Sequence, residues 1–203
     1  ILSSSFGLYT WMNNPESQMV AVTVRAGSKA EMALPDGTFV HLNAATNLEY
    51  DVNNSKQRLV KLSGEAFSDV ATNPDCPFKV IINDLQIEVV GTSFNVKTYK
   101  KDIVETSLLS GRIRISGGSL PHEYTLSPGQ KATYSAMDRT LRISKADAHV
   151  EAGWRDNYLI FESTPLIDVI AQIERWYGVE IRLHHKQIAQ DLLSGSFRNE
   201  SIQ

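Results

Sequence analysis

The residue types that carry most metal and nucleophile chemistry are sparse in this chain. Its single cysteine is Cys76, and no histidine or asparagine motif accompanies it, so we expect no catalytic thiol. The five histidines are His41, His122, His149, His184 and His185. No two of them have a ligand spacing that also brings a nearby carboxylate or thiolate into a recognisable metal set. We therefore expect neither a metal site nor a cofactor.

The acidic residues that folding could pair for general acid–base catalysis are Asp36, Glu65 and Asp69. Such catalysis needs two carboxyl groups held at a fixed separation around a substrate bond. Each of these three residues also has a simpler place, in a turn or on an exposed strand face. The chain contains no G-x-S-x-G elbow, no phosphate-binding loop and no G-x-G-x-x-G motif. The sequence therefore predicts that the protein is not an enzyme.

The dipeptide Gly91-Thr92 is the remaining candidate for chemistry. A threonine hydroxyl can attack the preceding carbonyl carbon when the backbone strains that peptide, and the resulting N–O acyl shift can end in chain cleavage. Glycine before threonine lowers the steric barrier to such a geometry. The alternative, which we favour, is a glycine bulge or bend between two strands.

Composition sets wider limits. The chain has 203 residues, of which 42% are hydrophobic, so one large or two small domains can bury a core. A net charge of −3 and dispersed basic residues give no field that would hold a nucleic-acid backbone, so we expect no nucleic-acid partner. No apolar stretch of about 18 residues is present, so we expect no bilayer span within this chain. The start at Ile1 and the end at Gln203 favour a piece of a longer protein.

Residues 20–150 have the pattern of an all-β domain. Short runs that mostly alternate apolar and polar residues are separated by turn residues such as Pro35-Asp36-Gly37 and Ser63-Gly64. The predicted strands are 29–34, 39–42, 48–52, 58–62, 66–70, 78–82, 85–90, 94–99, 104–108, 112–115, 123–126, 131–134 and 141–144. Strands this short predict a sandwich, a barrel or a coiled β-solenoid, and periodicity alone does not choose among them. No fixed repeat length is present, so any solenoid would be an irregular β-solenoid.

A small α/β unit is predicted for residues 151–203. Strand 158–162 precedes a helix that Thr164 caps, Pro165 opens and Gly178 ends. Strands 179–183 and 193–197 follow, and a second helix begins at Asn199, where the chain stops short of completing it. The unit thus has the order β-α-β-β. Residues 1–19 are left as a linker, which we expect to follow a membrane anchor.

An edge strand of this small unit is the expected contact surface for another protein. Its free backbone N–H and C=O groups form a template for strand addition by a partner. The candidate partner-binding residues are Val179, Ile181, Leu183, Leu193 and Phe197.

Six phrases, in the order in which they occur, resemble the FecR family of anti-sigma regulators. They are LPDGTFVHLNAATNLEY (34–50), LSGEAFSDV (62–70), PFKV (77–80), VVGTSFNV (89–96), SGRIRI (110–115) and LSPGQKA (126–132). The segments W-x-x-x-Y-L-I-F (154–161), ERWYGVEI (174–181) and SGSFRNESI (194–202) resemble the C-terminal extension of Bacteroidetes-type members. That extension is similar to the small signalling domain of secretins and TonB-dependent receptors. The pair Ser68-Asp69 departs from the family, which more often has a bulkier pair there.

The resemblance implies the periplasmic part of a single-pass inner-membrane protein. A cytoplasmic N-terminal region outside this chain would hold or assist an extracytoplasmic-function sigma factor. The part present here would contact the signalling domain of a TonB-dependent outer-membrane transporter. Some members of the family cut themselves at a Gly-Thr bond, and Gly91-Thr92 matches that position by motif.

A periplasmic or surface carbohydrate-binding module is the alternative function. All-β sandwiches offer faces on which Trp11, Trp154 and Trp176 could stack against sugar rings. The placement of Trp176 on the predicted helix, and of Trp154 at the predicted domain junction, favours packing for both.

Overall fold

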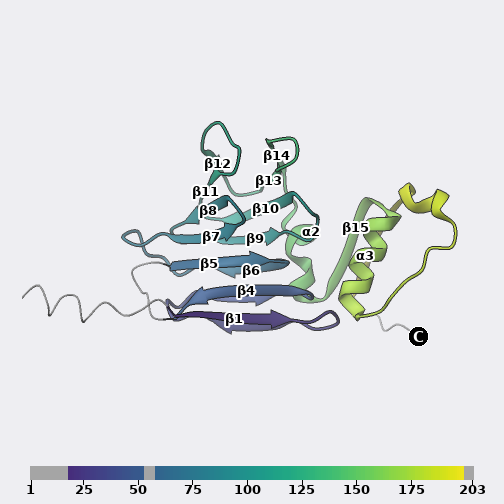
Figure 1. The fold of residues 1–203 in the computed structure, drawn as a ribbon, viewed down its shortest axis with the longest axis horizontal. Coiled ribbons are helices and arrows are strands. Elements are labelled where there is room, and N and C mark those ends of the chain that lie inside the picture. Colours follow the sequence, from purple (N-terminus) through teal and green to yellow (C-terminus); the bar gives the residue numbers. More distant parts are fainter. Residues whose placement is uncertain (1–17, 53–57, 199–203) are drawn as a thin grey trace, which may run out of the picture.

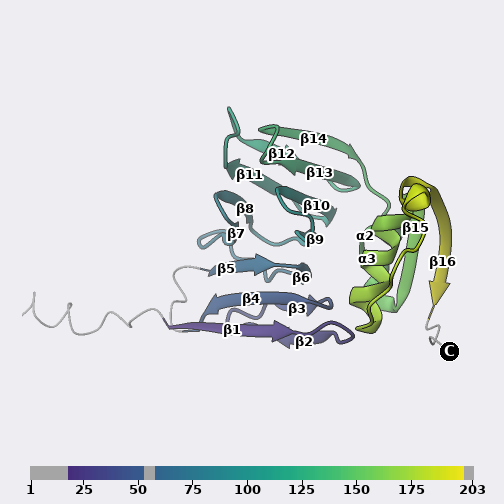
Figure 2. The same cartoon turned by 45° about the vertical axis from the view of Figure 1, so that its right-hand side comes forward.

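The computed structural model describes residues 18–52 and 58–198 of the chain. Within these residues, two seven-stranded sheets pack face to face, and a small α/β unit covers one of them (Figures 1 and 2). The predicted helix start at Asn199 and most of the predicted linker lie outside the described residues. Among the described residues, no helix is long enough and apolar enough to cross a membrane.

Each sheet is assembled from strands that lie far apart in the sequence. The first sheet has the order β1 (Met19–Val24), β4 (Thr46–Asp51), β5 (Arg58–Ser63), β7 (Phe78–Ile82), β8 (Leu85–Val89), β11 (Ile113–Gly117) and β12 (Tyr124–Leu126). The second has the order β14 (Thr140–Lys145), β13 (Gln130–Ser135), β10 (Ile103–Ser110), β9 (Ser93–Lys97), β6 (Glu65–Asp69), β3 (Phe39–Leu42) and β2 (Ala30–Ala33). We call the two sheets together the sandwich.

Strand pairing decides among the predicted β architectures. Each sheet has two separate end strands, β1 and β12 in the first and β14 and β2 in the second, so neither closes into a barrel. Neighbouring strands of both sheets are antiparallel, apart from the parallel pair β5 and β7. A solenoid would stack successive coils as parallel strands, whereas a sandwich is built from antiparallel ones. The fold is therefore a sandwich, although the chain crosses from one sheet to the other several times as it climbs from β1 to β12 (Figure 1).

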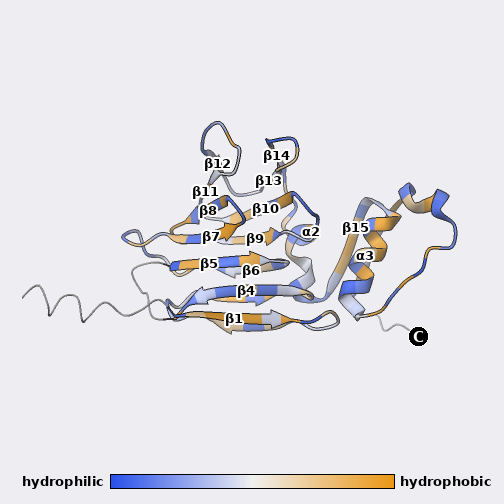
Figure 3. Cartoon of the chain, in the orientation of Figure 1, coloured by the Kyte–Doolittle hydropathy of each residue, from blue (hydrophilic) through white to orange (hydrophobic). Residues whose placement is uncertain are grey.

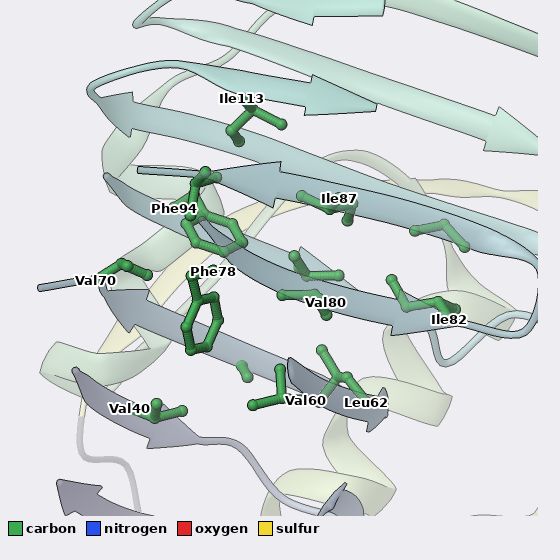
Figure 4. Packing of buried hydrophobic residues seen from close by; sticks show 14 of the residues in the cluster. Val40, Val60, Leu62, Val70, Phe78, Val80, Ile82, Ile87, Phe94 and Ile113 are labelled. Carbon is green, nitrogen blue, oxygen red and sulfur yellow. The ribbon is translucent and has the colours of Figure 1, made fainter. Parts of the chain in front are cut away.

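Alternation of buried and solvent-facing residues along strands such as β7 and β8 produces much of the core. In β7 and β8 every second residue is buried, while Lys79 and Glu88 stand opposite each other on the outer face with their charged atoms 3.9 Å apart. Figure 4 shows Phe78 of the first sheet and Phe94 of the second packing in the space between the sheets. Each is 1% exposed. Figure 3 shows the same alternation of polar and apolar positions along the strands. Burial of these side chains is the main force that holds the sheets together.

The first strand was not predicted from the sequence. β1 begins at Met19 and pairs antiparallel with β4, from Met19 opposite Asp51 to Val24 opposite Thr46. Its inward residues Val20, Val22 and Val24 follow the same period-two pattern as the other strands, so the signal was present.

The C-terminal unit begins with two short helices that the sequence did not predict. These are α2 (Ala148–Ala152) and the 3₁₀ helix η1 (Gly153–Asp156). Asp147 caps α2, because its Oδ1 accepts the backbone N–H of His149 at 2.8 Å. Then follow β15 (Tyr158–Pro165), α3 (Leu166–Tyr177), the 3₁₀ helix η2 (Lys186–Gln190) and β16 (Leu192–Arg198).

Two details of this unit correct the sequence analysis. Residues 179–183 do not form the predicted strand. Gly178 ends α3 in the left-handed region with a φ of 70°, and the carboxylate of Glu174 then accepts the backbone N–H of Ile181 at 2.8 Å. The helix end thus takes a donor that a sheet would need, and β16 pairs directly with β15. Pro165 is the N-cap of α3 rather than its first residue, and Thr164 belongs to β15.

Candidate functional site

The outermost strand of the C-terminal unit is β16, which lies at the far end of the molecule from the sandwich (Figure 2). In the described part of the chain it pairs with β15 and with no other strand. Its opposite edge therefore presents backbone N–H and C=O groups without a strand partner among the described residues. Leu192 is 67% exposed and Phe197 is 46% exposed, so this edge also carries apolar side chains open to solvent.

The structure separates the predicted partner-binding residues into two groups. Leu193 and Phe197 lie on the same face of β16, where Leu193 packs against the cluster of Leu159, Phe161 and Val169, and the Phe197 ring lies 6.1 Å from that of Phe161. The others, Val179, Ile181 and Leu183, lie in the irregular segment after α3. Val179 is 39% exposed, while Ile181 and Leu183 are half-buried. Their role in binding remains a prediction.

Leu192 was missed by the sequence analysis. Because Leu193 packs towards α3, the preceding side chain must point the other way. Once Leu193 is placed in the core of the unit, the alternation along the strand identifies Leu192 as an outward-facing apolar residue.

The junction between the C-terminal unit and the sandwich is mostly polar. A cleft of about 480 Å³ lies there, lined by residues of the second sheet, α2, η1, β15 and α3. Three acids of the cleft, Glu105, Glu151 and Asp168, face lysines. These pairs are Lys97–Glu105 at 3.6 Å, Lys131–Glu105 at 3.7 Å, Lys131–Glu151 at 2.6 Å and Lys100–Asp168 at 2.6 Å. These carboxylates are paired with lysines, and not with one another as general acid–base catalysis would need.

Glu65 is the buried carboxylate of this junction and is 7% exposed. Its Oε2 accepts a hydrogen bond from Asn43 Nδ2 at 2.7 Å, and its Oε1 accepts one from Asn95 Nδ2 at 3.0 Å. Burial raises the pKa of Glu65 above its ordinary value, although the nearby Lys97 and Arg175 charges and the two amides oppose that shift. The sequence predicted a place for Glu65 in a turn or on an exposed strand face. That was wrong, because α3 covers this face of the second sheet.

Asp36 and Asp69, the other two acids considered from the sequence, have structural surroundings of their own. The Asp36 carboxylate accepts the backbone N–H and the hydroxyl of Thr38, at 2.9 Å and 2.8 Å, and so holds the turn before β3. It also lies 3.2 Å from Arg58 Nη1. Asp69 ends β6 as an exposed residue.

Gly91 and Thr92 lie in the crossing from β8 to β9. A Cβ atom on Gly91 would lie 2.2 Å from Thr72 Oγ1 and 3.0 Å from Thr72 Cα, so the close approach of residue 72 requires glycine. Thr92 is 4% exposed, and its hydroxyl donates to the carbonyl oxygen of Arg112 at 3.1 Å. This geometry favours the structural explanation of the glycine. Cleavage at this bond remains untested.

Two of the tryptophans considered for sugar stacking are packing residues. Trp154 is 5% exposed and lies in a cluster with Phe67 and Ala152. The ring of Trp176 is covered by the ammonium of Lys29, 3.5 Å from its centroid. Trp11 lies outside the described residues.

Among residues 18–52 and 58–198, no group of three or more His, Cys, Asp or Glu side chains is placed to hold a metal ion.

Comparisons with known proteins assign the family. The family model described as FecR protein matches residues 20–114, and the model described as FecR, C-terminal matches residues 158–203. No curated protein matches the chain.

Two crystal structures of a candidate anti-sigma factor from Parabacteroides distasonis ATCC 8503 are similar to this fold. The structure at 1.65 Å resolution has 31% sequence identity and a TM-score of 0.82, and the match covers 90% of this chain and 86% of that one. The structure at 2.50 Å gives the same identity and TM-score over 91% and 86%. Identity at this level over most of both chains shows common family membership, and the chain belongs to the FecR family of anti-sigma factors.

Proposed function

We propose that this chain is the periplasmic sensor part of a FecR-like anti-sigma factor. It relays a signal from a TonB-dependent outer-membrane transporter to an extracytoplasmic-function sigma factor. In this proposal the transporter's signalling domain binds the C-terminal unit, and a cytoplasmic region of the same polypeptide, beyond an inner-membrane anchor, contacts the sigma factor. Family membership supports the regulatory part of this proposal.

The observation that carries the proposed contact is the open edge of β16. A partner strand can pair with it through backbone hydrogen bonds, and Leu192 and Phe197 supply exposed apolar surface beside those bonds. Strand addition is selective because successive side chains of the added strand point to opposite faces. The uncovered outer face of the first sheet is a weaker candidate, because its charges pair with one another across β7, β8 and β11.

The proposal is tested by calorimetric titration of this chain with signalling domains of TonB-dependent receptors from the source organism. We expect one of them to bind, and we expect Leu192→Glu or Phe197→Glu to weaken that binding by at least about tenfold, as for residues central to an interface. A charge at Leu192 leaves the core intact, because that side chain is 67% exposed. The Phe197 ring also lies beside Phe161, so Leu192→Glu is the cleaner of the two tests.

Met137→Glu is the matched control. Met137 is 79% exposed and lies in the turn between β13 and β14. The substitution Met137→Glu therefore adds the same charge to the sandwich instead of the C-terminal unit. Unchanged affinity in this variant, with loss in the β16 variants, supports the proposed edge. Unchanged affinity in both β16 variants would show that the contact lies elsewhere on the chain. If none of the signalling domains binds, the result counts against a transporter as the partner.

A further inference from the structure

The C-terminal turn of α3 is pressed against the turn between β1 and β2. The backbone N–H of Gly27 donates to the carbonyl oxygen of Arg175 at 2.8 Å. A Cβ atom on Gly27 would lie 3.2 Å from the Tyr177 carbonyl oxygen, and one on Gly178 would lie 3.3 Å from that of Ala26. Two glycines in the left-handed region therefore face each other, and the backbones meet without side chains between them.

Arg175 joins α3 to the second sheet by its side chain as well. Its guanidinium lies 4.1 Å from the centroid of the Tyr99 ring, and its charge acts on the buried Glu65 carboxylate. The Tyr99 hydroxyl in turn donates to the carbonyl oxygen of Ala44. Arg175 thus contacts the aromatic ring of one sandwich residue, Tyr99, and acts through its charge on the carboxylate of another, Glu65.

Lys29 makes the reciprocal contact from the sandwich to the C-terminal unit. Its ammonium donates to the carbonyl oxygen of Trp154 at 2.7 Å and to Oδ1 of Asn157 at 3.0 Å, and it lies over the ring of Trp176. One side chain of the sandwich therefore touches both η1 and α3.

These contacts remove charged groups from water. Burial raises the pKa of Glu65 and lowers the pKa of Lys29 to about 8, so the charged form of each is disfavoured where the C-terminal unit covers it. The apolar part of the junction is small and centres on Phe67 and Trp154. A polar contact that costs desolvation and gains little apolar burial is close to balance between its closed and open forms.

We propose that Lys29, Glu65, Tyr99 and Arg175 form a releasable latch that holds the C-terminal unit, from α2 to β16, on the sandwich. The latch opens without unfolding of the sandwich, so the C-terminal unit has a docked and an undocked position. This inference concerns contacts within the chain and stands whether or not a transporter is the partner.

Hydrogen exchange of the wild-type chain in increasing, sub-denaturing urea tests the latch first. The Gly27 amide reports docking, because its acceptor is on α3. The amides of β7 and β8 report global unfolding, because these strands lie in the core. We expect Gly27 and the amides of α3 to exchange through an opening that leaves β7 and β8 protected. Exchange of all of them at one common free energy would overturn the proposal.

Variants identify the groups that hold the latch. Arg175→Met and Lys29→Met are expected to speed exchange at Gly27 by about tenfold each, the size expected for loss of a partly buried cation–π or charge-assisted contact. Arg175→Lys should have a smaller effect, because the charge is kept.

Lys100→Met is the control, since it removes a junction ion pair whose lysine side chain is 57% exposed, and such pairs contribute little. Exchange at Gly27 that is unchanged in both latch variants, or equally fast in the control, would overturn the assignment of these residues. A latch variant that loses protection in β7 and β8 has a destabilised sandwich, so its exchange at Gly27 does not report undocking. In that case the urea-dependent exchange of the wild-type chain alone tests the latch.

Discussion

Trp154 and Asn95 are joined across the junction by a hydrogen bond of 3.2 Å, from the indole Nε1–H to the side-chain oxygen. The amide nitrogen of the same Asn95 donates to Glu65. The C-terminal unit thereby fixes the orientation of an amide that in turn holds a buried carboxylate. This chain of contacts links the junction to the second sheet through two hydrogen bonds.

Trp154→Phe tests that hydrogen bond. The variant keeps an aromatic ring in the Phe67 cluster but removes the indole donor, so Oδ1 of the buried Asn95 loses its partner. We expect a loss of about 1–3 kcal/mol in the free energy of unfolding, measured by urea denaturation. Tyr158→Phe is the control, because it also trims a polar group from an aromatic ring of the junction and should cost less than about 0.5 kcal/mol. Equal effects of the two changes would contradict the role given to the Trp154 donor.

Glu65 predicts a particular pH dependence. Its pKa is raised in the folded chain, so the folded state binds its proton more tightly than the unfolded state does. The stability that this group contributes is therefore fully present below its ordinary pKa and is lost as the pH rises through the raised value.

The measurement is the difference in unfolding free energy between the wild type and Glu65→Gln, followed from pH 7 down through the acid range. The unfolding free energy of the wild type should rise relative to that of Glu65→Gln as the pH falls. A difference that stays constant, or that moves in the opposite direction, contradicts burial as the dominant influence on this carboxylate.

Arg58 is predicted to be a major stabilising residue of the sandwich. Its side chain is 3% exposed and lies beside Asp36. Its guanidinium donates to the carbonyl oxygens of Ala71, Cys76, Asn73 and Val90 at 2.6 to 3.3 Å.

Arg58→Met removes these donors together and should cost about 3–5 kcal/mol in urea denaturation, as expected when one partner of a buried charged network is lost. Arg114→Met, at a side chain that is 50% exposed and bonded to Glu88, should cost less than about 1 kcal/mol. A small effect at Arg58 would show that the loops find other donors.

The Gly91-Thr92 bond is predicted to stay intact in the isolated chain. The Thr92 hydroxyl already donates to Arg112, and the glycine is explained by the close approach of Thr72. Mass spectrometry should therefore give one species near 22.6 kDa. Two fragments that disappear in Thr92→Ala would instead establish self-cleavage at this bond.

Local pattern predicted most strands of the sandwich, because many of them have a buried and a solvent-facing side, as in β7 and β8. The predicted strand at 179–183 is absent because of the local structure at the end of α3. Its alternating residues follow the left-handed Gly178, and the Glu174 carboxylate accepts the Ile181 N–H that a sheet would need.

The junction could not be predicted from spacing. Lys29, Glu65 and Arg175 come from three distant parts of the sequence, and nothing in the neighbourhood of any one of them indicates the other two. The sequence predicted the strand β16 but not which of its edges would be open. The residues 193–197 were identified as a strand, but which of its neighbours would be missing depends on the failed strand at 179–183.

Contact with another protein along β16 is tested most directly by amide hydrogen exchange of this chain with and without a bound transporter signalling domain. Strand addition predicts that amides of residues 192–198 that face away from β15 become protected, at alternating positions, while the amides of the first sheet are unchanged. Protection confined to the outer face of the first sheet, with β16 exchanging as fast as in the free chain, would contradict the proposed mode of action.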